Sequence, residues 1–180
     1  KKEFRLLIPI THPNLVNLYE LFFDNDQCFF TMELVKVLDF RTYTSQKDSS
    51  KTLQAFLQLA QGIKAIHQMG KLHRDIKPEN VLVTDEDRVV LLDFGLVAEL
   101  TSLGVPHSFE AVGTPIYMSH EQTKGLPLTE ASDWYSVGVM LFESLTGKPP
   151  FSGDPFTVFR AKQTTTPPPP KDLVKDVPDW

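Results

Sequence analysis

Residues 71–95, KLHRDIKPENVLVTDEDRVVLLDFG, carry the most informative pattern in the sequence. Within this stretch, VLV (81–83) and VVLL (89–92) are short apolar runs joined by a polar turn, which is a pattern that predicts a β-hairpin. The polar loop HRDIKPEN (73–80) leads directly into the first strand, and Asp93 follows the second. We therefore expect the polar side chains of the loop and the carboxylate of Asp93 to lie at one end of this hairpin.

A predicted helix lies on each side of this stretch. Across residues 51–69 the apolar side chains recur at helical spacing, and Gly70 is a suitable C-terminal stop. Residues 130–146 are apolar on most faces, with Thr129 as a candidate N-cap and Gly147 as the stop. We expect this second helix to be buried nearly all round.

The outer segments carry weaker patterns. Apolar and aromatic runs at 15–23 and 28–34 flank turn residues and predict another hairpin, and residues 3–10 resemble the end of a helix. DPFTVFRAK (154–162) has a short helical pattern. The run TTTPPPP (164–170) is interpreted as an ordered loop rather than a boundary between domains.

Composition bounds the class of protein. A chain of 180 residues that is 41% hydrophobic can bury one core, so one domain or the larger part of one is expected. The net charge of −5 is spread along the chain, which argues against nucleic acid or a charged membrane surface as a partner. Cys28 stands alone and supports neither a disulfide nor a cysteine metal site, so a reducing, cytoplasmic compartment is expected. No apolar stretch is long enough to span a bilayer.

The polar residues of the central stretch suit phosphoryl transfer. This reaction needs a carboxylate near the attacking hydroxyl, metal ligands on the phosphates and a cation for the developing charge. Asp75, Lys77 and Asn80 supply these three kinds of group within one loop. Asp93 offers the oxygen ligand that Mg²⁺ prefers.

The order of these motifs resembles that of a known family. HRDIKPEN, followed eighteen residues after Asp75 by Asp93-Phe94-Gly95, is similar to the catalytic loop and metal-binding triplet of eukaryotic-type (Hanks-type) serine/threonine protein kinases. GTPIYM (113–118) resembles the peptide-facing end of their activation segment. SHEQ (119–122) resembles the Ala-Pro-Glu-Gln of bacterial members, with His120 in the place of proline, a departure that would loosen the anchor of the segment.

The resemblance covers the whole chain and implies an α+β, protein-kinase-like fold. Residues 1–35 would be the remnant of the N-terminal lobe with the hinge, and residues 36–180 the helical C-terminal lobe, incomplete at its end. The glycine-rich loop and the lysine of the third strand are absent from this chain, so residues 1–180 alone are expected to be feeble or inactive. Flanking domains in a longer parent chain are also expected.

The resemblance assigns the catalytic and metal-binding roles. Asp75 would be the catalytic base and Lys77 the contact to the γ-phosphate of ATP, while Asn80 and Asp93 would hold Mg²⁺. The remaining members of the predicted catalytic set are Arg74 and Thr114.

Arg74 is the residue that a regulatory phosphate often pairs with in this family. We hypothesise that Glu110 is its permanent acidic partner. In the same resemblance, His73 and Phe94 would stack in a hydrophobic spine with Leu7 and Leu18.

The nucleotide would lie above the loop. Met32 falls at the gatekeeper position, Asp39 would reach the ribose and Leu82 would form the apolar floor under adenine. The predicted nucleotide-binding residues are Glu3, Met32, Glu33, Leu34, Val35, Asp39, Lys77 and Leu82. Of these, Glu33 to Val35 form the hinge, and Glu3 is the helix glutamate that pairs with the absent lysine.

These assignments imply ATP-dependent phosphorylation of proteins on serine or threonine, since Lys77 in the loop and Thr114 after Gly113 follow the serine/threonine pattern. Two alternatives stay open. One is a kinase-like module that binds partners without transferring phosphate. The other is a small-molecule phosphotransferase, which GTPIYM argues against because a peptide-facing segment serves protein substrates.

Overall fold

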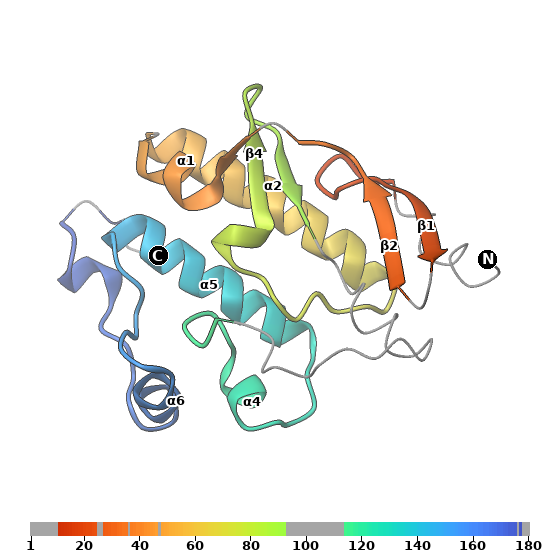
Figure 1. Ribbon diagram of the computed structural model, residues 1–180. Coiled ribbons are helices and arrows are strands. Elements are labelled where there is room, and N and C mark those ends of the chain that lie inside the picture. The colour runs from red at the N-terminus through yellow and green to blue at the C-terminus, as the bar shows by residue number, and fades with distance from the viewer. Residues whose placement is uncertain are drawn as a thin grey trace.

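The computed structural model describes residues 11–24, 27–35, 37–46, 48–92, 114–175 and 177. They form an α+β arrangement of two small antiparallel sheets and several helices, as the sequence predicts (Figure 1). The elements are β1 (Leu18–Asp24), β2 (Gln27–Met32), β3 (Val37–Asp39), α1 (Phe40–Gln46), α2 (Ser49–Gln68), the 3-10 turn η2 (Pro78–Asn80), β4 (Val81–Thr84), β5 (Val89–Leu91), α4 (His120–Thr123), α5 (Glu130–Thr146), α6 (Pro155–Thr164) and the 3-10 turn η3 (Pro170–Asp172).

Strands β1 and β2 form the predicted N-terminal hairpin. They pair in antiparallel register that starts with Leu18 opposite Met32. The hairpin begins later than its apolar run because Leu15 forms a bridge to Leu91 of β5. The N–H of Val16 also donates to the carbonyl of Leu91 at 3.0 Å. The segment before β1 therefore joins the two sheets.

The second sheet has the order β3-β4-β5, and all its pairs are antiparallel. Its β4–β5 pair is the hairpin predicted within residues 71–95. Strand β3 was not predicted, because three residues carry no readable alternation. Leu82 lies in the middle strand, opposite Asp39 on one side and Val90 on the other.

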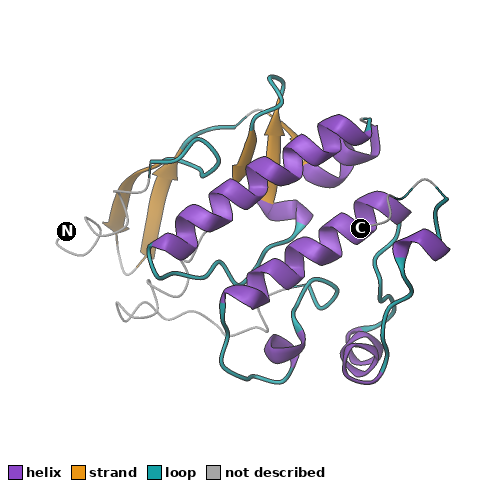
Figure 2. Ribbon diagram, turned by 180° about the vertical axis from the view of Figure 1, so that it is seen from behind, coloured by secondary structure: helices purple, strands orange, loops and turns teal. Residues whose placement is uncertain are grey.

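Helix α2 packs across one face of this sheet (Figures 1 and 2). Its N-terminus is capped by Asp48, whose carboxylate accepts the N–H of Lys51 at 2.9 Å. Gly70 follows the helix with a φ of 69°, which confirms the predicted stop. Two apolar side chains of the predicted pattern, Leu53 and Leu57, are 52% and 55% exposed, so the pattern predicts the helix but not all of its buried face. The buried residues recur at helical spacing. They are Thr52, Ala55, Phe56, Leu59, Gly62, Ile63, Ile66 and His67.

Helix α5 spans the predicted residues, starts after Thr129 and stops at Gly147, whose φ is 75°. The prediction that it is buried nearly all round is wrong for the residues described. Ala131, Trp134 and Gly138 are exposed, and their spacing places them on one side of the helix. Apolar composition alone does not reveal which face of a helix meets the core.

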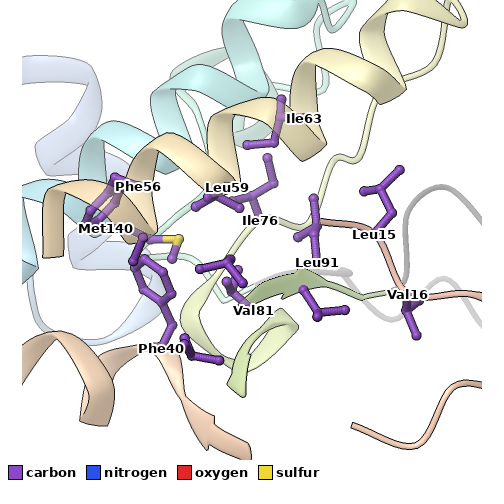
Figure 3. Close-up of a cluster of buried hydrophobic side chains, with 14 of the residues drawn as sticks. Leu15, Val16, Phe40, Phe56, Leu59, Ile63, Ile76, Val81, Leu91 and Met140 are labelled. Atoms are coloured by element: carbon purple, nitrogen blue, oxygen red, sulfur yellow. The ribbon is translucent and has the colours of Figure 1, made fainter. Parts of the chain in front are cut away.

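The core lies between α2, α5 and the three-stranded sheet (Figure 3). Phe40 and Phe56 meet edge to face, with ring centroids 5.0 Å apart. Side chains from the loop before η2 and from α5 complete the cluster, such as Ile76 and Met140, each 1% exposed. Burial of each such side chain stabilises the fold by about 2 kcal/mol. Because Ile76 packs into the core, the core holds the loop at 73–80 in place.

Helices α4 and α6 lie on the side of α5 that faces away from α2 (Figures 1 and 2). The short helix predicted at 154–162 is confirmed as α6. Asp154 caps it by accepting the N–H groups of Phe156 and Thr157 at 3.0 and 3.1 Å. The proline-rich run leaves α6 and enters η3, which contacts α5.

Within the described part of the chain, no helix is both long and apolar enough to cross a bilayer. The helix end predicted at 3–10 lies outside the described residues.

Candidate functional site

Three polar side chains of the loop meet in one place. Lys77 Nζ lies 2.8 Å from Asp75 Oδ2, and Asn80 Nδ2 donates to the same oxygen at 2.9 Å. Asn80 Nδ2 also donates to the backbone carbonyl of Asp75 at 2.8 Å. The turn η2 brings Asn80 back toward Asp75, because it closes the chain before β4 begins. A carboxylate, an ammonium group and an amide therefore share one small region, as expected.

Asp133 of α5 holds the loop at 73–80 in place, and its side chain is almost fully buried. Its Oδ2 accepts the N–H of His73 at 2.9 Å, and its Oδ1 accepts the N–H of Arg74 at 2.8 Å. His67 at the end of α2 lies 2.8 Å from the same carboxylate through Nε2. A buried carboxylate needs several donors, and this one has them. No local sequence pattern indicates this role of Asp133, because its partners are distant in the chain.

His73 connects the loop to the end of the β4–β5 hairpin. Its Nε2 lies 2.7 Å from the carbonyl oxygen of Leu92, and its Nδ1 accepts the N–H of Asp75 at 3.3 Å. These partners require the proton on Nε2. The N–H of Leu92 in turn donates to the carbonyl of Asn80 at 2.9 Å. Asp75 and the residue before Asp93 are therefore fixed relative to each other.

The spine predicted from the resemblance is described only in part. His73 and Leu18 are both buried. Phe94 and Leu7 lie outside the described residues. The stacking of the four stays a prediction.

Arg74 has a φ of 71°, which is a strained conformation for a residue other than glycine. Its backbone is held on both sides, because Gln122 Nε2 donates to its carbonyl at 2.7 Å while Asp133 accepts its N–H. Glu110, its hypothesised partner, lies outside the described residues.

The segment at 119–122 starts helix α4 through a capping box. Ser119 Oγ accepts the N–H of Gln122 at 3.3 Å, and Gln122 Oε1 accepts the N–H of Ser119 at 2.9 Å. His120 occupies the first helical position. Glu121 accepts a hydrogen bond from Ser132 of α5. Segment 119–122 is therefore anchored to both the loop and α5. In the structure, the motif SHEQ forms a capping box.

The turn at 114–118 lies beside a charged network that sequence reasoning missed. Tyr117 donates from its hydroxyl to Glu143 at 2.6 Å and accepts from Arg41 at 2.6 Å. Arg41 also pairs with Glu143 at 3.2 Å and lies 3.8 Å from Glu79 of the loop. Burial, followed by the hydrogen bond to Glu143, raises the pKa of Tyr117, so this hydroxyl stays protonated.

Thr114 begins this turn, and its carbonyl accepts the N–H of Tyr117 at 2.9 Å. The residues that resemble the family's peptide-facing segment thus form a compact turn. A catalytic role for Thr114 stays a prediction.

The predicted hinge follows β2. The side chain of Glu33 turns toward Arg88, whose two terminal nitrogens lie 2.6 and 3.2 Å from its carboxylate oxygens. Asn17 Nδ2 also donates to this carboxylate at 3.0 Å. The hydrogen bond to Arg88 is the main cause that lowers the pKa of Glu33. The N–H of Glu33 donates to the carbonyl of Asn17 at 2.8 Å, so the backbone carbonyl is the group of Glu33 that a ligand could use. Contact of the hinge with adenine stays a prediction.

The remaining predicted nucleotide contacts differ in exposure. Met32 and Leu34 are 42% and 86% exposed, while Val35 packs against the core. Asp39 accepts the N–H and the hydroxyl of Thr42 at 2.9 and 2.6 Å, so it caps α1. This capping was missed, and contact with a ribose stays a prediction. Glu3 lies outside the described residues.

The donor set for Mg²⁺ is described in part. The amide nitrogen of Asn80 is engaged by Asp75, so its Oδ1 is the atom suited to a cation. Amide and carboxylate oxygens fit Mg²⁺. Asp93 lies outside the described residues. The part of the chain that the structure covers contains no cluster of three or more histidine, cysteine, aspartate or glutamate residues that could hold a metal by itself.

Comparison with known proteins identifies the family to which this chain belongs. The chain matches the family model of the protein kinase domain over residues 1–171. It is 31% identical over 183 residues to the probable serine/threonine-protein kinase CPE1738 of Clostridium perfringens, covering 99% of this chain and 27% of that protein. It is 35% identical over 158 residues to PkaA of Streptomyces coelicolor, covering 84% and 29%. It is 32% identical over 157 residues to PrkC of Bacillus subtilis, covering 86% and 24%. The chain thus spans about a quarter of the length of these relatives.

Proposed function

Because this chain belongs to the protein kinase domain family, we propose that its parent protein transfers the γ-phosphoryl group of ATP to serine or threonine hydroxyls of proteins. The relatives named above are serine/threonine-protein kinases. The single observation that carries the proposal is the convergence of Lys77 and Asn80 on one oxygen of Asp75.

Asp75 is the proposed base. Its carboxylate is held by Lys77 and Asn80, so it is oriented before a substrate arrives. The substrate hydroxyl would give its proton to Asp75 as its oxygen bonds to the γ-phosphorus, and the bond from that phosphorus to the bridging oxygen of ATP would break. Lys77 can turn from Asp75 to a phosphate oxygen, where an ammonium group offsets the negative charge that develops.

Asn80 and Asp93 are the proposed ligands of Mg²⁺, which neutralises phosphate charge when bound. The backbone of the hinge at 33–35 is proposed to bind adenine, with Leu82 beneath the base. Support comes from Glu33, whose side chain is held by Arg88 and whose N–H donates to Asn17, so its carbonyl can accept a hydrogen bond from the base.

Protein rather than a small molecule is the proposed acceptor. The turn at 114–118 is tied to α5 by Tyr117 and to α4 through Ser119, which makes a fixed surface beside the loop. A fixed surface suits an extended peptide. Incubating the full-length protein with labelled ATP and either a generic serine/threonine protein or small alcohols distinguishes the two kinds of acceptor.

The substitution Asp75→Asn tests the proposed role. Asparagine keeps the shape of the side chain and an oxygen for Lys77, so the fold and nucleotide binding should persist. Removal of a general base typically costs a factor of 10² to 10⁴, so we expect kcat to fall about a thousandfold. The measurement is initial rate of protein labelling by the full-length protein, with nucleotide affinity measured in parallel.

Asp85→Asn is the matched control, because Asp85 is exposed in the β4–β5 turn. It should label protein at the parent rate. If Asp75→Asn labels protein as fast as the parent, Asp75 is not the base. If the parent binds ATP but labels neither kind of acceptor, the alternative of a binding module replaces the proposal.

A further inference from the structure

Lys162 is a buried cation in the last turn of α6. Lys162 is 9% exposed, although a lysine is rarely buried without an acidic partner. Its ammonium donates to the carbonyl of Ile116 at 2.7 Å and to the carbonyl of Met118. It also lies 5.0 Å from the centroid of the Tyr135 ring. The ammonium therefore has three partners, and all are neutral.

These partners belong to two other parts of the molecule. Ile116 and Met118 lie in the turn at 114–118, and Tyr135 lies on α5. The two carbonyls are 46 and 44 residues away from Lys162 in sequence. Hydrogen bonds to these part-buried carbonyls offset the cost of desolvating the ammonium group. The side chain thus joins α6 to the turn through hydrogen bonds that an apolar side chain could not make.

We propose that Lys162 is a positioning residue for the peptide substrate: it fixes the backbone of the turn at 114–118, so that this surface is preformed when a peptide docks. The inference rests on the proposed function, since it takes the turn to be the peptide-facing surface. Lys162 touches no reacting atom, and its effect passes through the carbonyls of Ile116 and Met118.

The charge state supports this role. Burial lowers the pKa of Lys162 to about 8, so the side chain is still mainly a cation at pH 7. The neighbouring elements also carry acidic groups, but these are engaged elsewhere: Glu121 of α4 by Ser132, Asp133 of α5 by the loop and Glu143 of α5 by Tyr117. A charged donor bonds carbonyls about twice as strongly as a neutral one.

The contact also explains why α6 and α4 lie together. Met118 directly precedes Ser119, the cap of α4, so Lys162 holds the chain at the point where α4 starts. Tyr117 is fixed on the other side by Glu143. The turn is therefore clamped from α6 and from α5, and removal of one clamp should loosen it without removing the other.

The test compares Lys162→Met with Lys162→Arg in the full-length protein. Methionine keeps the length of the side chain and removes its donors, while arginine keeps donors and charge. We expect Lys162→Met to raise the KM for a serine peptide roughly tenfold, while kcat and the KM for ATP stay near the parent values. Lys162→Arg should recover most of the peptide affinity. The exposed Lys148→Met is the control and should change nothing.

Two results would overturn the proposal. One is an unchanged peptide KM in Lys162→Met. The other is a lower kcat with both KM values unchanged, which reports a smaller folded fraction and so only a packing role. If Lys162→Met does not fold, Lys162→Gln is used in its place; it removes the charge but keeps an amide donor on a shorter side chain, so a smaller rise in the peptide KM is expected, and an unchanged peptide KM would overturn the proposal.

Amide hydrogen exchange separates this inference from the proposed function. Faster exchange at residues 116–119 in Lys162→Met than in the parent supports the clamp even if the parent transfers no phosphate. Equal exchange rates there would overturn the clamp even if the parent is an active kinase.

Discussion

Asp133 shows how much one buried carboxylate can organise. It accepts two backbone N–H groups from the loop and lies against His67, so α5, α2 and the loop meet at one side chain. Hydrogen bonds to a charged acceptor are about twice as strong as neutral ones. The strained backbone of Arg74 is tolerated because its N–H and carbonyl are both bonded.

The pair of Glu33 and Arg88 gives a prediction about pH. The hydrogen bond from Arg88 lowers the pKa of Glu33 in the folded protein below its ordinary value of 4.5. The stabilisation is therefore complete above pH 4.5 and is lost as the pH falls through the lower, folded pKa. We expect Arg88→Met to reduce the free energy of unfolding by about 1 kcal/mol at pH 6 and by much less at pH 3.

Urea unfolding at pH 6, 4 and 3 checks this expectation. Lys64→Met removes an exposed cation from α2 and should leave the pH dependence of the parent unchanged. A loss of stability in Arg88→Met that is equal at pH 6 and pH 3 would contradict the assignment to Glu33.

At the scale of the elements, single residues at the boundaries fix where the helices start and where they stop. Asp48 and Asp154 cap the starts of α2 and α6, and Ser119 caps α4. Gly70 and Gly147 follow α2 and α5 with positive φ. These boundaries depend on the residue at the boundary itself, which is why sequence predicted the two glycine stops correctly.

Gly147 therefore gives a prediction for α5. Its φ of 75° is left-handed, and no heavy atom lies within 4 Å of where a Cβ would be, so any cost comes from the backbone alone. We expect Gly147→Ala to lower the free energy of unfolding by about 1 kcal/mol. Gly147→Asn should cost less, because asparagine tolerates this conformation.

Thermal or urea unfolding of the two variants beside the parent measures the difference. Equal stability of alanine and asparagine variants would show that backbone conformation is not the cause.

At the scale of the whole molecule, residues 14–16 hold the sheet, the hairpin and α2 together. Asn14 Nδ2 donates to the carbonyl of Val89 at 2.9 Å and to Gln58 of α2 at 3.0 Å. The carbonyl of Asn14 accepts the N–H of Leu91 at 3.0 Å. Gly62 of α2 allows this close approach, because a Cβ there would lie 2.9 Å from the carbonyl oxygen of Asn14.

Gly62→Ala should therefore destabilise the whole domain. Although alanine favours a helix, the clash with backbone forces α2 away from Asn14, and we expect a loss of about 2 kcal/mol in the free energy of unfolding. Gln61→Ala is the matched control, because Gln61 is exposed on the same helix and should change stability by less than about 0.5 kcal/mol. A Gly62→Ala variant as stable as the parent would show that α2 can shift at no cost.

Local patterns determined much of this protein. The spacing of apolar residues predicted α2 and α5, and turn residues predicted both hairpins, because each signal is contained within one element. The groups proposed for catalysis were predicted from the loop HRDIKPEN in the same way. Asp75, Lys77 and Asn80 are so close in sequence that a short turn is enough to bring them together.

Tertiary structure alone decided what holds those residues in place. Asp133 lies 60 residues from His73, and Lys162 lies 46 residues from Ile116. Packing of α5 and α6 fixes such pairs, and no local pattern encodes which distant partner a side chain will meet. The same holds for strand β3, which exists because β4 pairs with it, and for the exposed side of α5. Short-range sequence thus predicted the groups proposed to react, and the packing of distant elements decided how they are positioned.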